Sequence, residues 1–301
     1  MNEQELKNQF EKITLWERGG QRAPHKPLLI LFALSQCLRK NERFTSYAEI
    51  DEKLKELLIE FGPTRKSYHP EYPFWRLQND GIWELNNAEN VTARIGNTDA
   101  KKSELVKYNV HGGFKKKIYD FLKSKQSIIP ALAASVLEEN FPSSMHEDLL
   151  QAIGLDVGLN QDLKRKRDPY FRDKILKAYE YQCAVCGFNV RVGHSLVALE
   201  AAHIKWHQAG GPDTEKNGVA LCVLHHKLFD RGAFSLTKEM KIEVSDRAYG
   251  TQGFAEWLMA FHGKKIKRPQ HPYYFPEPQF IKWHLSEVFQ GYGRYNETKT
   301  I

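Results

Sequence analysis

The sequence has no long hydrophobic run. Its longest uninterrupted apolar stretch is Leu28–Leu34, seven residues, whereas a helix that crosses a membrane needs about 20. The opening segment, Met1–Phe10, is polar and acidic and lacks the basic and apolar regions of a secretory signal peptide. These absences predict a cytoplasmic protein that does not associate with membranes.

Cysteine is scarce, and its few positions are unevenly spread. Of the four cysteines, Cys37 stands alone in an apolar run, while Cys183, Cys186 and Cys222 fall within 40 positions of one another. Three clustered thiols make a poor disulfide framework in a reducing compartment, but they supply most of a metal site. The sequence therefore predicts metal ligation in its second half.

Internal repeats and low-complexity tracts are also absent. The proportions of hydrophobic (41%) and charged (27%) residues are those of a globular protein and exclude wholesale disorder. A length of 301 residues favours two domains. We predict a first domain over residues 1–155, a linker over 156–167 that holds a KRKR cluster, and a second domain over 168–301.

Positive charge is concentrated in the second half of the chain. Residues 1–150 hold 22 Lys and Arg against 21 Asp and Glu, a net charge of +1. Residues 151–301 hold 22 against 16, a net charge of +6, so the two halves add up to +7. This surplus favours a polyanionic partner such as nucleic acid.

The first domain reads as helices that alternate with short strands. An apolar pattern over Leu28–Cys37 predicts a helix buried on all sides. Ser46 and Glu49 form a capping-box signature for a second helix that ends at Gly62-Pro63. Two further helices are expected near residues 131–139 and 146–153. The prolines in Tyr68–Leu77 argue against a helix, so an aromatic-rich loop or ribbon is predicted there.

Two matched pairs of metal ligands stand in the second domain. Cys183 and Cys186 form one pair, Cys222 and His225 form the other at the same two-residue spacing, and 35 residues separate them. Four such ligands suit one tetrahedral Zn²⁺ and leave no open coordination position. We therefore predict a structural zinc.

Three more polar residues are interleaved with these ligands. His203 ends an expected strand over residues 197–204, Asn217 precedes the next strand, and His226 follows His225 on an expected short helix. Adjacent helical residues point about 100° apart, so His226 faces away from the zinc. These residues, within the stretch NGVALCVLHHKLFDRGAF, resemble the His-Asn-His motif of HNH nucleases with their ββα-metal fold, over about residues 165–295.

The resemblance implies a role for each of the three residues. His203 would be the general base that takes a proton from the attacking water. Asn217 would hold the loop and orient the imidazole of His203. His226 would bind one catalytic Mg²⁺ or Mn²⁺, and the products would carry a 5′-phosphate and a 3′-hydroxyl.

The second protein ligand of that cation is left open. Many members of the family have an acidic ligand directly before the base, where this sequence has Ala202. Glu200 lies on the same side of the strand as Ala202 by alternation and is the first candidate. Asp213 and Asp230 are the others.

Two segments of the first domain, Arg22–Leu34 and Tyr68–Trp83, resemble the sulfur-binding domain of phosphorothioate-dependent type IV restriction endonucleases, over about residues 5–155. A phosphorothioate sulfur is larger, softer and less hydrated than oxygen, so an apolar cup accepts it at little cost. The candidates for this cup are Pro70, Tyr72, Pro73 and Phe74, or Tyr68, His69 and Pro70. The candidates for flanking phosphates and a base edge are Arg22, His25, Lys26 and Arg76, with non-specific attraction from the lysines of residues 101–125.

Together these features predict an α+β protein with a mixed helical DNA-reading domain followed by a ββα-metal nuclease domain. The expected function is an endonuclease that recognises phosphorothioated double-stranded DNA and cuts nearby. Two alternatives stay open: an HNH nuclease that reads a modified base such as methylcytosine, and a zinc-stabilised DNA-binding protein without catalysis. We expect Tyr273–Phe275 and Trp283–Phe289 to pack on their own domain, and the alternative is that they form the contact of a homodimer.

Overall fold

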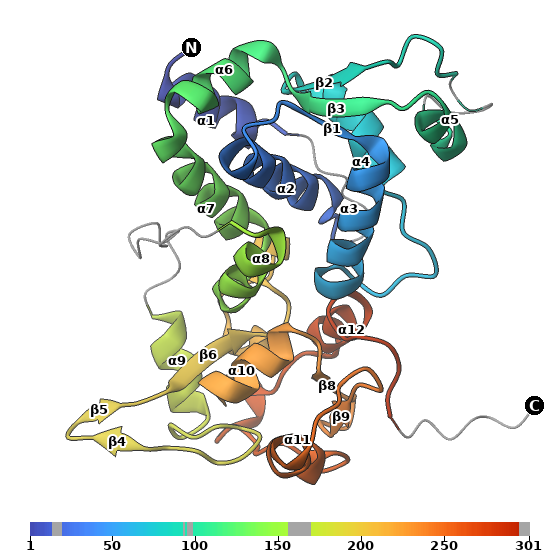
Figure 1. Cartoon of the computed structure of the whole chain (residues 1–301). Helices are drawn as coiled ribbons and strands as arrows, with labels where there is room; N and C mark the ends of the chain where they lie inside the picture. Colours follow the sequence, from blue (N-terminus) through green and yellow to red (C-terminus); the bar gives the residue numbers. More distant parts are fainter. Residues whose placement is uncertain (14–19, 93, 95–98, 156–169, 295–301) are drawn as a thin grey trace, which may run out of the picture. The chain divides into compact units, whose positions relative to one another are not determined.

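The computed structural model describes residues 1–13, 20–92, 94, 99–155 and 170–294, and its chain forms two compact units (Figure 1). The first unit comprises Met1–Asn140 and His146–Leu163, and the second comprises Phe141–Met145 and Lys164–Ile301. The predicted linker, residues 156–167, lies outside the described residues. Within the described part of the chain, every helix is too short or too polar to span a bilayer.

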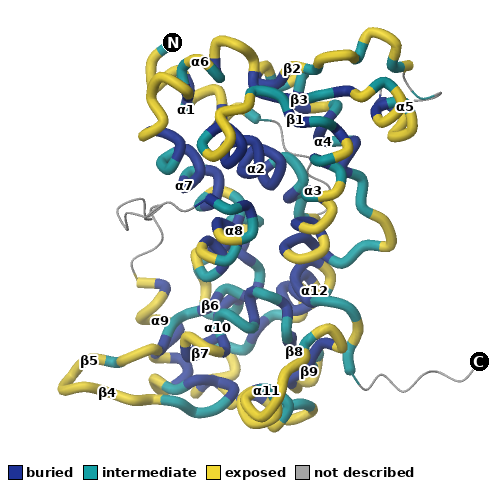
Figure 2. The backbone as a smooth tube through the Cα atoms, in the orientation of Figure 1, coloured by how far each residue is buried: buried dark blue, intermediate teal, exposed yellow. Residues whose placement is uncertain are grey.

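The first unit is mainly helical and holds one three-stranded antiparallel sheet in the order β1-β3-β2. Its elements are α1 (Glu3–Glu11), α2 (His25–Arg39), β1 (Phe44–Ser46), α3 (Tyr47–Phe61), α4 (Glu71–Arg76), β2 (Trp83–Asn86), α5 (Lys102–Lys107), β3 (His111–Phe114), α6 (Lys116–Ser124), α7 (Ile129–Asn140) and α8 (His146–Ile153). Helices α3, α4, α6, α7 and α8 all contact α2. The buried helix predicted at Leu28–Cys37 is thus confirmed at the centre of the unit (Figure 2).

Local sequence signals explain where the central helices begin and end. The Ser46 hydroxyl accepts a hydrogen bond from the Glu49 backbone N–H (3.2 Å) and caps α3, and α3 ends before Gly62 as predicted. Cys37 lies in the buried part of α2, where burial raises the pKa of its thiol to about 12. This thiol is core and takes no part in metal binding.

The predicted loop at Tyr68–Leu77 is wrong for residues 71–76, which form α4. Pro70 is the N-cap of this helix and Pro73 lies in its first turn. The first N–H groups of a helix have no partner inside the helix, so proline costs no hydrogen bond at these positions. The two prolines therefore start a helix here.

The second unit consists of three two-stranded antiparallel sheets surrounded by helices. Its elements are a short 3-10 turn (Ser143–Met145), α9 (Phe171–Ala178), β4 (Arg191–Val192), β5 (Ser195–Leu196), β6 (Leu199–His203), β7 (Gly218–Cys222), α10 (Val223–Asp230), β8 (Phe234–Leu236), β9 (Ile242–Val244), α11 (Gln252–Trp257) and α12 (Pro278–Glu287). Strands β6 and β7 pair in register from Leu199–Cys222 to His203–Gly218, and α10 follows directly. This hairpin and helix form the predicted ββα arrangement, and the α+β class is confirmed.

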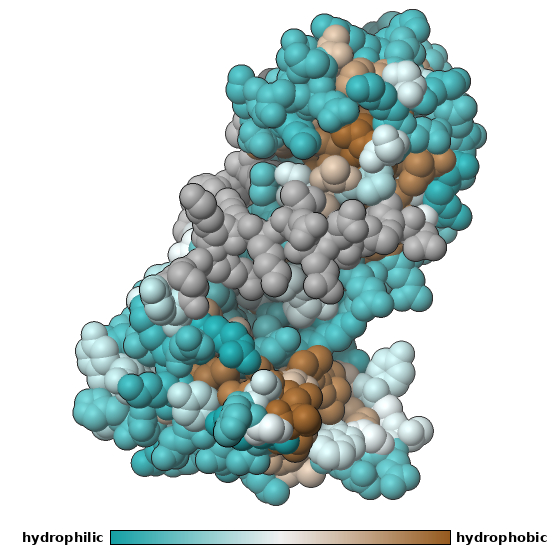
Figure 3. Space-filling view, turned by 90° about the vertical axis from the view of Figure 1, so that its left-hand side faces the viewer, coloured by the Kyte–Doolittle hydropathy of each residue, from teal (hydrophilic) through white to brown (hydrophobic). Residues whose placement is uncertain are grey.

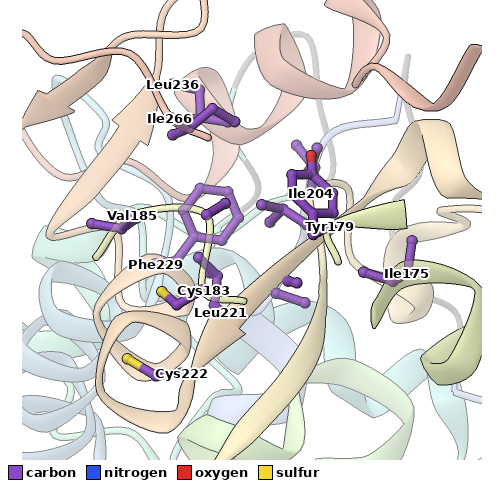
Figure 4. Close-up of a cluster of buried hydrophobic side chains, with 14 of the residues drawn as sticks. Ile175, Tyr179, Cys183, Val185, Ile204, Leu221, Cys222, Phe229, Leu236 and Ile266 are labelled. Carbon is purple, nitrogen blue, oxygen red and sulfur yellow. The ribbon is translucent and has the colours of Figure 1, made fainter. Parts of the chain in front are cut away.

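A single hydrophobic core fixes the hairpin and its helices. Ile175 of α9, Leu221 of β7 and Phe229 of α10 meet in it with Leu236 and Ile266 (Figure 4). Gly218 allows α9 to come close, because a Cβ at this position would lie 2.1 Å from the Ile175 Cδ1 atom. The ring of Phe171 can therefore reach β6 from α9.

The C-terminal segment packs within the second unit. Trp283 (8% exposed) and Phe289 (6% exposed) are buried, and the Trp283 ring contacts that of Trp206. Residues 283–289 thus offer little apolar surface to a second copy of the chain. Tyr273 is 63% exposed. On the face drawn in Figure 3, hydrophilic side chains cover most of both units and hydrophobic ones gather in smaller areas.

Candidate functional site

Four side chains of the second unit converge as metal ligands. The ligand atoms of Cys183, Cys186, Cys222 and His225 all lie within 4.8 Å of one another. The His225 Nδ1 atom is 3.7 Å from the Cys183 Sγ and 3.1 Å from the Cys222 Sγ, close to the separation of about 3.6 Å that tetrahedral zinc would impose. Figure 4 shows Cys183 and Cys222 at one edge of the core. Chemistry and geometry both fit a tetrahedral metal ion.

Neighbouring groups prepare this cluster for a metal ion. The His225 Nε2–H donates to the Trp257 carbonyl oxygen (2.8 Å), which directs Nδ1 toward the thiols. Hydrogen bonds from the Cys186 and Cys222 thiols lower the pKa of Cys183 and favour its thiolate. A thiolate is the form that binds metal.

His203 stands at the end of β6 with a carboxylate partner. Its Nε2 lies 2.7 Å from the Asp213 Oδ1, and its ring stacks on Phe171 with centroids 4.0 Å apart and planes 12° apart. The aromatic contact fixes the ring plane, and the carboxylate stabilises the protonated imidazole. Asp213, a candidate metal ligand from the sequence, thus forms a hydrogen bond with His203.

Asn217 is fully buried and clamps the loop that follows β6. Its Oδ1 accepts from the Lys205 backbone N–H (2.8 Å), and its Nδ2 donates to the carbonyl oxygens of Lys205 (2.9 Å) and Pro212 (3.0 Å). The amide thus holds both sides of the loop that carries Asp213. Its side-chain hydrogen bonds go to backbone atoms, and the His203 ring is oriented by Asp213 and Phe171.

His226 lies between two carboxylates. Its Nδ1 is 2.7 Å from the Glu200 Oε2, and its Nε2 is 3.2 Å from the Asp230 Oδ2. The hydrogen bond from His226 lowers the pKa of Glu200, so this carboxyl is ionised at neutral pH. His225 and His226 thus contact different groups, as the turn of about 100° between helical neighbours requires.

The two carboxylates differ in their surroundings. The Glu200 side chain is 47% exposed, whereas the Asp230 side chain is 2% exposed. The Asp230 Oδ1 also accepts from the Trp206 Nε1–H (3.1 Å), and its Oδ2 accepts from the Ser144 hydroxyl. Hydrogen-bond donors thus already occupy both oxygens of Asp230, while the Glu200 carboxylate is open to solvent. An exposed carboxylate oxygen beside an imidazole nitrogen is a donor pair that fits a divalent cation.

In the first unit, a histidine ring and two guanidinium groups surround the ring of Tyr72. The His69 ring stacks on it with centroids 4.9 Å apart, and the guanidinium groups of Arg76 and Arg94 lie 4.9 and 5.3 Å from its centroid. The Arg94 Nη1 also donates to the Tyr72 hydroxyl (3.2 Å). We name His69, Tyr72, Arg76 and Arg94 the Tyr72 cluster.

Buried carboxylates hold this cluster in place. Glu71 accepts from Arg94 (3.0 Å) and lies 3.1 Å from His69, and Asp99 binds Arg76 through two hydrogen bonds of 2.7 and 2.6 Å. Both carboxylates are nearly inaccessible to solvent. Sequence reasoning missed Glu71, Arg94 and Asp99, because no spacing signal links residues that meet only through the fold.

The other predicted DNA-reading residues differ in accessibility. Pro70 and Pro73 are buried, and Phe74 is fully enclosed against Tyr47 and Trp83, so these three do not line an exposed cup. Tyr68 and His69 are partly exposed. The apolar surface available at this place therefore comes from Tyr68, His69 and Tyr72.

Three further candidates, Arg22, His25 and Lys26, differ in their surroundings. Arg22 donates to the Phe61 carbonyl oxygen (2.8 Å), and Lys26 pairs with Asp80 (2.6 Å). Burial, together with the nearby charges of His69 and Arg65, lowers the pKa of His25 to about 4. His25 is therefore neutral at pH 7.

Each half of the chain matches a known protein family. Residues 3–158 match the family model described as "ScoMcrA-like, DNA sulfur-binding domain", and residues 183–237 match that of an HNH endonuclease. No curated protein sequence matches the chain.

Among solved structures, the sulfur-binding domain of ScoMcrA complexed with phosphorothioated DNA is 21% identical over 50% of this chain and 94% of that chain, with a TM-score of 0.44. The type IV phosphorothioation-dependent restriction endonuclease ScoMcrA is 20% identical over 60% of this chain and 34% of that chain, with a TM-score of 0.40. The modification-dependent TagI restriction endonuclease is 24% identical over 44% of this chain and 41% of that chain, with a TM-score of 0.30. Since the first family match extends over more than half of the sequence, the chain belongs to the ScoMcrA-like DNA sulfur-binding domain family and carries an HNH endonuclease segment in its second half.

Proposed function

We propose that this protein is an endonuclease that binds phosphorothioated DNA through its first unit and hydrolyses phosphodiester bonds nearby with its second. The proposal rests on one observation: the same chain matches the sulfur-binding family at residues 3–158 and the HNH endonuclease family at residues 183–237. A nuclease segment supplies cleavage, and the sulfur-binding segment restricts it to modified DNA.

The partly exposed rings of Tyr68, His69 and Tyr72 supply the surface for sulfur recognition. A sulfur atom loses less hydration than an oxygen atom when it contacts such rings, so the contact discriminates between the two. Arg76 and Arg94, each paired with a buried carboxylate, lie beside the same tyrosine, where their guanidinium groups would meet the phosphorothioate anion and its neighbouring phosphates.

Hydrolysis uses His203 as general base. With Nε2–H donating to Asp213, Nδ1 is the ring nitrogen that takes a proton from the attacking water. The Asp213 carboxylate then stabilises the imidazolium, and Asn217 keeps the loop that carries Asp213 in place. Attack at phosphorus leaves a 5′-phosphate and a 3′-hydroxyl.

Glu200 and His226 would hold the catalytic Mg²⁺ or Mn²⁺, and the ion would take the place of the proton that His226 Nδ1 donates to Glu200. Such an ion neutralises the charge that develops on the phosphate and on the departing 3′ oxygen. Asp230 keeps the His226 ring in position through Nε2, so that Nδ1 stays beside Glu200. The Cys183, Cys186, Cys222 and His225 cluster would hold a structural Zn²⁺ with no open coordination position.

A double-strand break requires two such sites, because one HNH site cuts one strand. A homodimer on DNA would supply both. The exposed Tyr273 offers a contact for it, whereas residues 283–289 are largely buried in the second unit.

Digestion of matched plasmids with and without phosphorothioate tests the function. We expect cutting of the modified plasmid in Mg²⁺ or Mn²⁺ and little cutting of the unmodified one, measured as loss of supercoiled DNA. His203→Ala protein from the same purification controls for contaminating nucleases. Equal cutting of both plasmids would contradict sulfur recognition and leave the nuclease assignment intact.

Substitution of His203 tests its role as the base. His203→Ala should lower the cleavage rate by about 10²–10⁴-fold, the usual contribution of a general base, while DNA binding persists. His207→Ala is the matched control, since the His207 ring lies 5.9 Å from that of His203 and has no role in the proposed mechanism. Cleavage by His203→Ala at the wild-type rate would remove His203 from that role.

The neutral state of His25 leads to a pH prediction. An NMR titration should place its midpoint near 4, with the signal assigned by its loss in His25→Gln. The unfolded chain, with a histidine pKa near about 6.5, binds this proton first, so the first unit loses about 1–3 kcal/mol of stability as pH falls from about 6.5 to about 4. A midpoint above 6 would show that His25 is charged near neutral pH and acts as a cation.

A further inference from the structure

A row of exposed basic residues runs beside the metal-ligand cluster of the second unit. Residues 264–267 extend along the segment that leads into β9: the Ile266 N–H donates to the Met240 carbonyl oxygen (2.9 Å), and the Ile242 N–H donates to that of Lys264 (2.9 Å). An antiparallel bridge sets Lys241 directly opposite Lys265. We name Lys241, Lys265, Lys267 and Arg268 the basic ribbon.

The residues of this ribbon are exposed to solvent. Ile266 is buried at 4% exposure, whereas Lys265 and Lys267 on either side of it are exposed and share one face by alternation. Successive lysines on that face are about 6.6 Å apart along the chain, comparable with the separation of successive phosphates on one DNA strand. Lys241 and Arg268 are exposed as well.

The charges of the ribbon are poorly compensated within the protein. Like charges directly opposite one another, as at Lys241 and Lys265, destabilise a pair of strands. Residues 263–268 contain four basic side chains and no acidic one, and Glu239 and Glu243 are the acidic residues beside Lys241 in the sequence. Among the described residues, none of the ribbon side chains forms an ion pair. Such an arrangement suits a polyanion bound from outside.

The ribbon is anchored to the metal-ligand cluster. The Lys267 backbone N–H donates to the Ala184 carbonyl oxygen (2.8 Å) between Cys183 and Cys186, and the Lys267 Nζ donates to the Gln182 Oε1 (2.5 Å). The Lys267 ammonium also lies over Gly187, where an added Cβ would come within 2.8 Å of it. A backbone held in this way presents its charges at fixed positions on the nuclease unit.

We propose that the basic ribbon binds the sugar-phosphate backbone of duplex DNA and holds the nuclease unit on its substrate independently of sequence and of sulfur. The inference rests on the proposed function and adds a second DNA contact, separate from both the Tyr72 cluster and the His203 site. Lysine ammonium groups act as point charges that suit phosphates, whereas base edges call for planar forks. Ile266 is turned inward, so the ribbon offers no apolar residue for insertion into a lipid surface.

The test is the salt dependence of binding by the full chain to an unmodified duplex. A variant with Lys241→Gln, Lys265→Gln and Lys267→Gln should bind more weakly, and the slope of log Kobs against log salt should be shallower by about 2–3, since each phosphate contact contributes about 0.9. The same three positions changed to arginine should restore the slope. A control with Lys12→Gln, Lys55→Gln and Lys282→Gln removes equal charge from dispersed exposed lysines.

A ribbon variant whose slope equals that of the control, with an unchanged unfolding temperature, would overturn the proposal. So would binding of the wild-type chain to phosphatidylserine vesicles in preference to DNA. The preference for phosphorothioated over unmodified duplex should survive in the ribbon variant. The experiment measures DNA binding, so its result does not depend on whether the protein cuts DNA. A wrong ribbon proposal is thereby distinguished from a wrong nuclease proposal.

Discussion

The convergence of Cys183, Cys186, Cys222 and His225 is the constraint on which the nuclease unit depends. Cys183 and Cys186 precede the β6–β7 hairpin, Cys222 ends it, and His225 lies in the first turn of α10. A metal ion held by all four would tie the segment that precedes the hairpin to the junction between strand and helix. The direction of α10 is then fixed, and the residue after His225 is turned toward β6.

Carboxylates hold the two histidines of the HNH motif in place. His203 is held by Asp213, and His226 by Glu200 and the buried Asp230, so each histidine has a defined partner before any substrate binds. Such preorganisation matters because hydrolysis of a phosphodiester depends mainly on placing charge and proton acceptors correctly. The first unit uses the same device at the Tyr72 cluster, where buried carboxylates hold the arginines.

Spacing along the chain was sufficient to predict the parts of the site built from local segments. The two ligand pairs follow from their matched two-residue spacing. The order of strands and helix and the separation of His225 from His226 follow from periodicity within one hairpin and helix. The partners Asp213 and Arg94 were not assigned in this way, because their roles arise where distant segments meet. Helix α4 was missed for a different reason. Proline in general argues against a helix, although it is compatible with the N-cap and the first helical turn, where these two prolines lie.

Hydrogen exchange on the full chain, with added Zn²⁺ and after treatment with a strong chelator, tests the account most directly. The account predicts that removal of the ion by a strong chelator abolishes amide protection in β6, β7 and α10, while α2 and α3 of the first unit keep theirs, and that added Zn²⁺ restores protection. Unchanged protection of β6, β7 and α10 after complete metal removal would contradict it, because the hairpin and helix would then be held without the cluster.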